Sequence, residues 1–438
     1  MSPYEIGGLF FAVTIVLIML RLPVGVAMLL MGGLGYVLLN GWGPLINFMK
    51  TMAYGRVSNF NLTVIPLFLL MGQFGSKSGI NEALYAAARA WLGHLRGGLA
   101  VATVGGCAAF GAVCGSSTAT AVTMAQVALP ELRRYGYAPS LATGTLAAGG
   151  TLGILIPPSL ILVIYAVIAE TSILDLFIAA IIPGILATVL YMAAIAVVVR
   201  LRPEAGPAAE REGWRRRFAS LKGVWPVVAT FFLVLFGMYQ GWFSATEAAA
   251  VGAALVGLHG AMFGRMRWAQ FREALIETGR TTAMIFLILI GAEIYNSFLA
   301  LTQLPTELAD AIQGLGWPPH AVIVLILLIY LVLGCIMDSL SMILLTVPVF
   351  LPVVLGLDLG MSYDAAIVWF GIIAVVVVEV GLITPPIGIN VFVINAMARD
   401  VPMLETFRGI VPFLASDVVR IAFLVAFPGI TLWLTGLT

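Results

Sequence analysis

The chain has 438 residues, of which 61% are hydrophobic and 10% are charged. A composition this apolar excludes a set of soluble domains and is typical of a protein that lies within a bilayer. The 22 Lys and Arg residues nearly balance the 21 Asp and Glu residues, so the net charge of +1 offers no basic surface for nucleic acid.

Ten segments are long and apolar enough to predict membrane-spanning helices, each of which needs about 20 such residues. The first has no small-residue cleavage site, so we expect a retained span rather than a signal peptide. The polar stretch at 200–222 is too short to build its own core, which predicts a connecting loop. The predicted spans are residues 5–20, 23–40, 60–75, 140–169, 175–199, 224–241, 245–263, 281–301, 364–397 and 411–436.

Two further apolar stretches, residues 98–130 and 320–352, are 33 residues long each. One straight helix of that length would run roughly 50 Å, against a hydrocarbon core of about 30 Å. Two full spans would need about 40 residues. The length therefore predicts a re-entrant helical hairpin in each stretch, which enters the membrane, turns at mid-depth and leaves on the same side.

Positive charges predict that the hairpins enter from opposite faces, because Lys and Arg collect in short cytoplasmic loops. The second hairpin lies within residues 281–398, which contain no Lys or Arg, so its ends are predicted to be external. The arginine-rich loop at 200–222 is predicted to be cytoplasmic. Lys50 and Arg56 do not fit, since they fall in a loop predicted to be external. Arginines flank the first hairpin and predict cytoplasmic ends: Arg89, Arg96, Arg133 and Arg134.

The two halves of the chain share four landmarks in the same order. Since five spans precede the central loop and five follow it, the halves enter the membrane from opposite faces. We therefore expect an all-α polytopic membrane protein built as an inverted repeat, residues 1–199 and 223–438, each with one hairpin and one broken helix. Such repeats mark secondary transporters with a site at the repeat interface. The landmarks are Gly111 with Gly334, Ser116 with Ser339, Pro130 with Pro352, and Gly153-Ile-Leu-Ile-Pro157-Pro158 with Gly381-Leu-Ile-Thr-Pro385-Pro386.

Each predicted hairpin has a polar tip, from Cys114 to Thr120 in the first and around Asp338 in the second. A turn inside the bilayer leaves backbone groups that need protein, water or a ligand as partners. The N-terminus of the returning helix can bind an anion such as a carboxylate. Small-residue helix packing is the alternative interpretation. The ionisable Asp338 at membrane depth favours function.

Paired prolines at 157–158 and 385–386 interrupt apolar runs. They remove backbone donors and leave the preceding carbonyls free, so each helix is predicted to break there. The oxygens at such breaks are hard ligands suited to Na⁺. An ordinary proline kink explains one break alone, but two breaks that each follow a polar-tipped hairpin favour ion sites.

Three other acidic residues in apolar surroundings have simpler interpretations. Glu247 and Glu293 are expected to be interfacial or packing carboxylates. Asp417 is expected to pair with Arg420, three positions later on the same helix face.

Several runs spread over nearly the whole chain resemble one known family, the large membrane subunit of tripartite ATP-independent periplasmic (TRAP) transporters, or DctM-like proteins. The two Pro-Pro elements in order are the most specific part of the resemblance. Cys114 departs from it, because a serine or another small residue is expected there. The runs are Ile65 to Gly72, Ser116 to Pro130, Gly150 to Ser159, Thr246 to Ala249 and Glu379 to Gly388.

The resemblance implies a Na⁺-coupled importer of small organic anions, such as C4-dicarboxylates or sialic acids, that works by an elevator mechanism in the bacterial inner membrane. It implies two partners, a small four-helix membrane subunit and a periplasmic substrate-binding protein, and no organic cofactor. Carried over by motif, the first Na⁺ site comprises Gly115, Ser116, Ser117, Gly150, Gly153 and Pro157, and the second comprises Gly334, Asp338, Ser339, Gly381, Thr384, Pro385 and Gly388. The substrate candidates are Ser117, Thr118, Ser339 and Asn390.

Other classes of protein fit the sequence less well. An intramembrane hydrolase with Ser116 or Ser117 as nucleophile, or Asp338 as acid, would lack a His or Lys at matching depth. An open channel does not account for two sites in mirrored hairpins. The three cysteines lie in apolar stretches and predict neither a disulfide framework nor a zinc site. A single-component ion-coupled carboxylate carrier of related fold is the nearest alternative.

Overall fold

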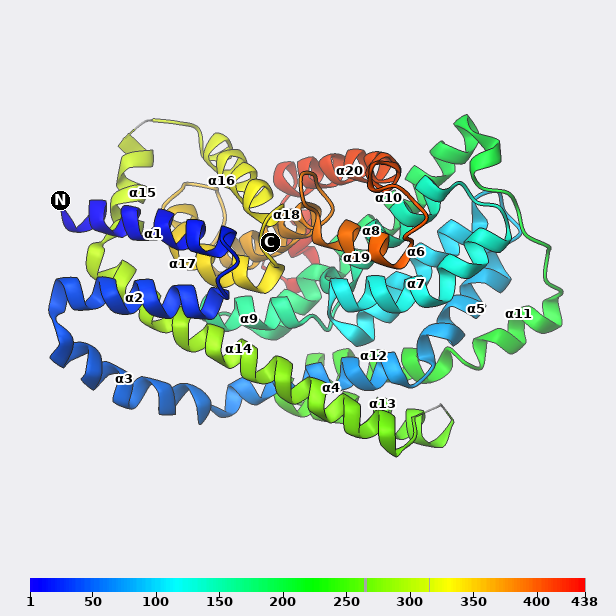
Figure 1. The fold of residues 1–438 in the computed structure, drawn as a ribbon, viewed down its shortest axis with the longest axis horizontal. Helices are drawn as coiled ribbons and strands as arrows, with labels where there is room; N and C mark the ends of the chain where they lie inside the picture. The colour runs from blue at the N-terminus through cyan, green and yellow to red at the C-terminus, as the bar shows by residue number, and fades with distance from the viewer. Residues whose placement is uncertain (264–265, 315, 438) are drawn as a thin grey trace.

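The computed structural model describes residues 1–263, 266–314 and 316–437, and within these residues every regular element is helical (Figure 1). Thr438, which ends the predicted second repeat, lies outside the described residues. The first half contains α1 (Pro3–Met19), α2 (Val24–Asn40), α3 (Trp42–Val57), α4 (Val64–Lys77), α5 (Ile80–Leu92), α6 (Gly98–Cys114), α7 (Ser117–Arg134), α8 (Pro139–Leu155), α9 (Leu160–Ile168) and α10 (Ile173–Leu201). After α11 (Trp214–Leu221), the second half contains α12 (Trp225–Tyr239), α13 (Ala245–Met262), α14 (Trp268–Thr302), α15 (Leu304–Gly314), α16 (Pro319–Gly334), α17 (Ser339–Leu355), α18 (Tyr363–Gly381), α19 (Ile389–Met397), α20 (Met403–Ala426) and α21 (Gly429–Leu432).

Both 33-residue stretches turn, and both Pro-Pro segments interrupt a helix. The turn between α6 and α7 consists of Gly115 and Ser116, and the turn between α16 and α17 covers residues 335–338. α8 and α9 are bent by 45° across the first break. α18 ends at Gly381, and α19 begins at Ile389, directly after the seven-residue gap at 382–388. Both Pro-Pro bonds are cis.

The helix packing of the first half recurs in the second half. α6 and α7 pack on α8, as α16 and α17 pack on α18. The short helix after each break crosses to the other half: α9 contacts α17, and α19 contacts α7 and α8. α2 packs along α14, and α4 along α13. Each broken helix is therefore enclosed by hairpins of both halves.

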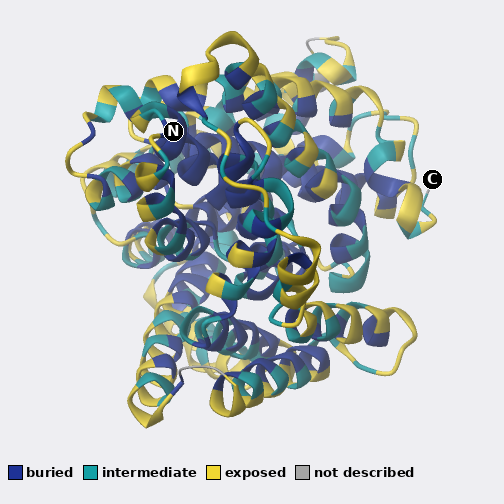
Figure 2. Ribbon diagram, turned by 90° about the vertical axis from the view of Figure 1, so that its right-hand side faces the viewer, coloured by how far each residue is buried: buried dark blue, intermediate teal, exposed yellow. Residues whose placement is uncertain are grey.

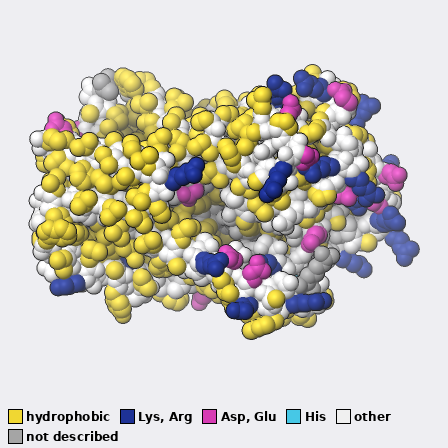
Figure 3. Space-filling model, viewed as in Figure 1, with side chains coloured by type: hydrophobic (Ala, Val, Ile, Leu, Met, Phe, Trp, Pro, Cys, Tyr) yellow, Lys and Arg dark blue, Asp and Glu magenta, His cyan; other side chains and the backbone are white. Residues whose placement is uncertain are grey.

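The two hairpins come from opposite ends of the molecule. In Figure 1, α6 and α7 lie to the right and α16 and α17 to the left. In the same view, most Lys and Arg side chains lie in the right-hand half, where α11 is found, while the left-hand half is mainly hydrophobic (Figure 3). Because positive charge marks the cytoplasmic side, this distribution predicts that the first hairpin enters from the cytoplasm and the second from the outside.

α18 is the central helix of the fold. Its most apolar window is 94% buried, against 39% for α10 and 33% each for α13 and α20. A helix that is hydrophobic on all sides belongs in the core, and one with a single apolar face buried leaves the other to lipid. Buried residues gather in the middle of the molecule and exposed ones at its rim (Figure 2). The second break therefore begins at the centre of the protein.

Four helices, α3, α5, α11 and α15, occupy segments in which no helix was expected. α3 and α4 form a pair bent by 51°, and this pair takes the place that the single 35-residue α14 has in the second half. Lys50 and Arg56 thus lie on a helix rather than in a loop. Arg56 pairs with Glu293 on α14, so its positive charge is balanced although it lies on the side predicted to be external.

The last spanning helix begins and ends earlier than residues 411–436. α20 starts at Met403, directly after Pro402, and Glu405 and Arg408 pair with each other 3.0 Å apart on its first turns. It ends at Ala426, since Pro428 disfavours helical backbone at Phe427. By length and composition, five described helices could cross a membrane, or up to eight if each bent pair is one span.

The topology predicts a labelling pattern. In right-side-out vesicles, a cysteine placed at Arg215 on α11 is expected to resist a membrane-impermeant thiol reagent, because the basic end is predicted to face the cytoplasm. A cysteine at Lys50 on α3 is expected to react. Native thiols should be replaced first, although Cys107 and Cys335 are buried. Ready labelling at 215 with protection at 50 would show that the protein has the opposite orientation.

Candidate ion and substrate site

Glycines bring the first hairpin into contact with the first broken helix. A Cβ atom on Gly111 would lie 2.7 Å from Cα of Gly153, which is closer than real Cβ atoms come. The turn uses Gly115, whose φ of +63° lies in the left-handed region that favours glycine. A Cβ atom on Gly115 would lie 3.1 Å from the carbonyl oxygen of Pro158. A larger residue at Gly111 or Gly115 would therefore push the tip away from the break.

Backbone oxygens of the first tip face the glycines of α8. A Cβ atom on Gly153 would lie 2.7 Å from the Ser116 carbonyl oxygen, and one on Gly150 would lie 3.1 Å from that of Ser117. The Thr120 hydroxyl lies against Gly153, is fully buried and has no hydrogen-bond partner among the described residues. Thr120 was missing from the predicted site. Its spacing of four from Ser116, which puts both residues on one helix face, was the available signal.

The second tip meets the second break through an equivalent contact. A Cβ atom on Gly381 would lie 2.6 Å from Cα of Gly334. Beside it, the Cys335 thiol donates to the carbonyl oxygen of Pro385 over 3.4 Å. The Thr384 hydroxyl donates to a carbonyl oxygen one turn earlier over 2.6 Å. The structure thus brings the two predicted parts of this site together as well.

The two breaks differ in exposure. Prolines 157–158 are buried, whereas prolines 385–386 are exposed. Asp338 is exposed too, and its carboxylate caps α17 by accepting the backbone N–H of Ser341 over 3.1 Å and the hydroxyl of the same residue. The first tip and break are closed against each other, and the second break is open to the surface.

Both returning helices offer free backbone donors. Ser116 caps α7 by accepting the Ala119 N–H over 3.5 Å, as Asp338 caps α17. In each helix this cap uses the third N–H group. Free N–H groups at a helix N-terminus attract an anion. The groups without a partner among the described residues are those of Ser117 and Thr118 on α7, and of Ser339 and Leu340 on α17.

Asn390 is the most unusual polar residue of the predicted site. It is fully buried in the first turn of α19, and neither its Nδ2 nor its Oδ1 has a hydrogen-bond partner among the described residues. α19 follows Gly388, whose φ of +62° turns the chain from the break into this helix. A buried amide left unpaired costs about 1–3 kcal/mol. This cost is recovered if a ligand pairs with the amide.

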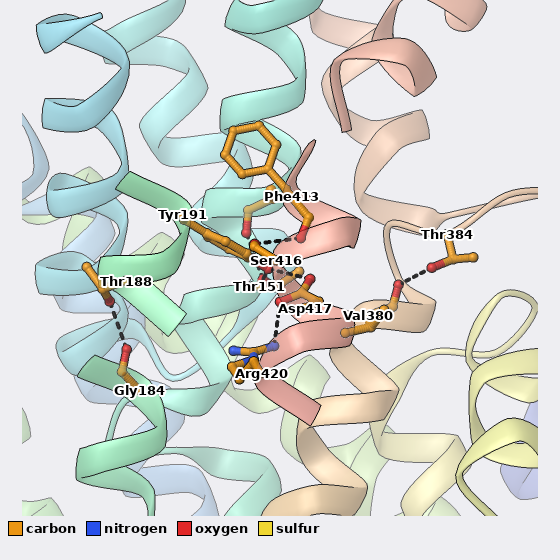
Figure 4. Close-up of polar contacts among 11 residues, drawn as sticks. Thr151, Gly184, Thr188, Tyr191, Val380, Thr384, Phe413, Ser416, Asp417 and Arg420 are labelled. Carbon is orange, nitrogen blue, oxygen red and sulfur yellow. Dashed lines mark hydrogen bonds and ion pairs between the residues drawn. The ribbon is translucent and has the colours of Figure 1, made fainter. Parts of the chain in front are cut away.

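A buried polar cluster lies outside the predicted sites (Figure 4). It confirms the expected pair on α20, because Arg420 Nη2 lies 2.9 Å from Asp417 Oδ1. The Tyr191 hydroxyl on α10 donates to Asp417 Oδ2 over 2.9 Å. Thr151 on α8 lies beside Tyr191. The sequence shows the Asp-Arg spacing but has no local signal for the partners on α8 and α10.

Two re-entrant hairpins from opposite faces, each packed on a broken helix of an inverted repeat, define a secondary membrane transporter. The family model described as "Tripartite ATP-independent periplasmic transporter, DctM component" matches residues 11–430. The chain belongs to this family of TRAP transporter large permease subunits, and it is a multi-pass protein of the bacterial inner membrane, not an enzyme.

Individual relatives cover most of the chain. A "C4-dicarboxylate TRAP transporter large permease protein DctM" of Pseudomonas aeruginosa is 36% identical over 85% of this chain and 86% of its own length. A "Sialic acid TRAP transporter large permease protein SiaM" of Vibrio cholerae is 32% identical over 95% of each. Among solved structures, the Alcanivorax borkumensis YdaH transporter superposes with a TM-score of 0.61 over 89% of each chain, at 16% identity, which is a likeness of fold.

Proposed function

We propose that this TRAP large permease subunit imports small organic anions with Na⁺ by an elevator mechanism. The observation that supports this proposal best is the mirrored contact of each tip with its own break, Gly111 with Gly153 and Gly334 with Gly381. Two equivalent oxygen-lined contacts suit two cations, and the hairpins that carry them suit alternating access from opposite faces.

In this proposal, oxygen atoms bind the cation and N–H groups bind the anion. The carbonyl oxygens of Ser116 and Ser117 and the Thr120 hydroxyl would hold Na⁺ at the first contact, since hard cations take oxygen ligands. At the second contact, the carbonyl oxygens of Ile383 and Thr384, which accept no hydrogen bond from the described residues, would do the same. The N-termini of α7 and α17 and the amide of Asn390 would bind the anion between the tips.

An elevator needs a moving part and a fixed part. The two hairpins and two broken helices pack mainly on one another, with α10 and α20 beside them, and would form the transport domain. The paired helices α2 with α14 and α4 with α13 would form the scaffold. The proposal also includes a small four-helix membrane subunit and a periplasmic binding protein as partners. The relatives named for C4-dicarboxylate and sialic acid suggest a carboxylate as the cargo.

The test is uptake into proteoliposomes that hold this chain with the small subunit, supplied with the cognate binding protein and a panel of radiolabelled carboxylates. We expect uptake of at least one carboxylate only with an inward Na⁺ gradient and only with the binding protein present. Uptake that continues without the binding protein would favour a single-component carrier instead. Uptake that ignores the Na⁺ gradient would contradict the coupling.

A further inference from the structure

The polar cluster of Thr151, Tyr191, Asp417 and Arg420 connects three helices of the proposed transport domain. Tyr191 on α10 bonds Asp417 on α20, which is paired with Arg420, and Thr151 Oγ1 on α8 lies 3.2 Å from the Tyr191 hydroxyl oxygen (Figure 4). Each of the four residues is at most 1% exposed. The Arg420 guanidinium also lies 6.0 Å from the centre of the Tyr191 ring. The cluster is therefore one closed unit.

The hydrogen bonds from Thr151 through Tyr191 to Asp417 have one donor direction. A tyrosine hydroxyl has a single hydrogen, and that of Tyr191 is donated to Asp417. The Thr151 hydroxyl must then act as the donor toward Tyr191, and it shares its hydrogen with the Ala148 carbonyl oxygen 2.7 Å away. A chain of donors thus leads from α8 through α10 to the carboxylate on α20.

Glu379 brings α18 into the same cluster. Its side chain is 1% exposed, and its Oε1 has no hydrogen-bond partner among the described residues. It lies within electrostatic range of both Arg420 and Asp417. A hydrogen bond also joins the same two helices, because the Trp369 indole N–H on α18 donates to the Leu424 carbonyl oxygen on α20 over 3.0 Å.

The members of the cluster occupy equivalent positions in the two halves. Thr151 stands two residues before Gly153, and Glu379 stands two residues before Gly381. Tyr191 follows the proline of α10 by eight positions, and Arg420 follows that of α20, Pro412, by eight. The cluster therefore lies where the two repeats meet. Thr151 and Glu379 each stand two residues before a glycine that touches a hairpin tip.

Stability alone is a weak reason for this cluster. Taking charges out of water costs several kcal/mol per ion, and apolar side chains of the same volume are often as stabilising as a buried ion pair. Charged residues in the bilayer are usually functional for the same reason. What hydrogen bonds and ion pairs supply that apolar contacts do not is a fixed orientation, here of α8 relative to α18 through α10 and α20.

We propose that Tyr191, Asp417 and Arg420 are positioning residues that couple the two breaks, so that Na⁺ bound at one raises the Na⁺ affinity of the other. The inference rests on the Na⁺ coupling proposed above. A cation at the first break orders the end of α8 around Thr151, and one at the second orders the end of α18 beside Glu379. Because the cluster connects these two helix ends, binding of the first cation already orders part of the structure that the second cation would otherwise have to order.

The test is Tyr191→Phe, which removes one hydroxyl and keeps the ring contact with Phe413, 5.4 Å between centroids. In Na⁺-dependent uptake we expect the Hill coefficient to fall from between ~1.5 and ~2 to about 1, and the half-saturating Na⁺ concentration to rise about fivefold or more. The maximal rate at saturating Na⁺ should stay close to that of the wild type. Tyr137→Phe is the matched control, since that buried hydroxyl accepts the Leu99 backbone N–H over 3.0 Å within the first half and outside the cluster.

A double-mutant cycle with Thr151→Val distinguishes a loss of coupling between the breaks from a general loss of helix packing. Because both changes cut the same connection, the double variant should resemble either single one rather than add to it. Unchanged Hill coefficients in Tyr191→Phe, an equal loss in Tyr137→Phe, or additive effects in the cycle would overturn the inference. Wild-type uptake that needs no Na⁺ would instead contradict the proposed function, so the two failures can be told apart.

Discussion

Replacing Gly381 by alanine is expected to weaken Na⁺-dependent uptake strongly, because it adds a methyl group where the second tip meets the second break. The new Cβ would lie 2.6 Å from the Gly334 Cα and 3.1 Å from its carbonyl oxygen, and backbone atoms cannot move aside as a flexible side chain would. Overpacking of this kind costs about 1–3 kcal/mol. If that cost falls wholly on the contact between tip and break, the Na⁺ affinity drops by about 5- to 150-fold.

Gly279→Ala provides the matched control. Gly279 also lies within a helix, α14, but a Cβ there would meet no atom within 4 Å. The half-saturating Na⁺ concentration and the thermal stability of the purified protein should both be measured for each variant. Thr384→Ala, which deletes a hydroxyl without adding bulk, should weaken Na⁺ affinity in the same direction. Unchanged Na⁺ affinity in both Gly381→Ala and Thr384→Ala would exclude the second site.

The turns and breaks could be predicted from the sequence because their causes are local. A pair of prolines removes donors wherever it occurs, and a glycine such as Gly115 marks a left-handed turn without knowledge of its neighbours. The length of each hairpin follows from the thickness of a bilayer. The segments at α3 and α15 were missed for the opposite reason: their mixed polarity does not predict a span, and their helices depend on packing against α2 and α14, and against α1 and α17.

The chemistry of the site could be predicted only in part, because it depends on contacts between helices that are far apart in the chain. Asp338 stays a predicted ion ligand, and only the structure shows that its side chain is exposed and caps α17. Thr120 becomes a candidate only once Gly153 is seen against it. The partner of Tyr191 lies 226 positions away, and no pattern of spacing points to it.

Asn390→Ala is expected to reduce uptake strongly while leaving the protein at least as stable as before. Neither end of this buried amide has a partner among the described residues, so its removal breaks no hydrogen bond within them and takes away an unpaired polar group. If the amide binds the anion, the lost bonds to a charged group are worth about 1.5–3 kcal/mol, and the KM for the substrate should rise by about tenfold or more.

Asn395→Ala, on the same helix, should have the opposite effects. The Asn395 Nδ2 donates to the Val401 carbonyl oxygen over 2.7 Å and so fixes the chain after α19. Its loss should lower the thermal stability and leave the KM of the folded protein unchanged. Thermal unfolding and uptake kinetics, measured on the same preparations, separate the two roles. A destabilised Asn390→Ala with a normal KM would show that the amide supports the fold, and the substrate would then have to lie elsewhere between the tips.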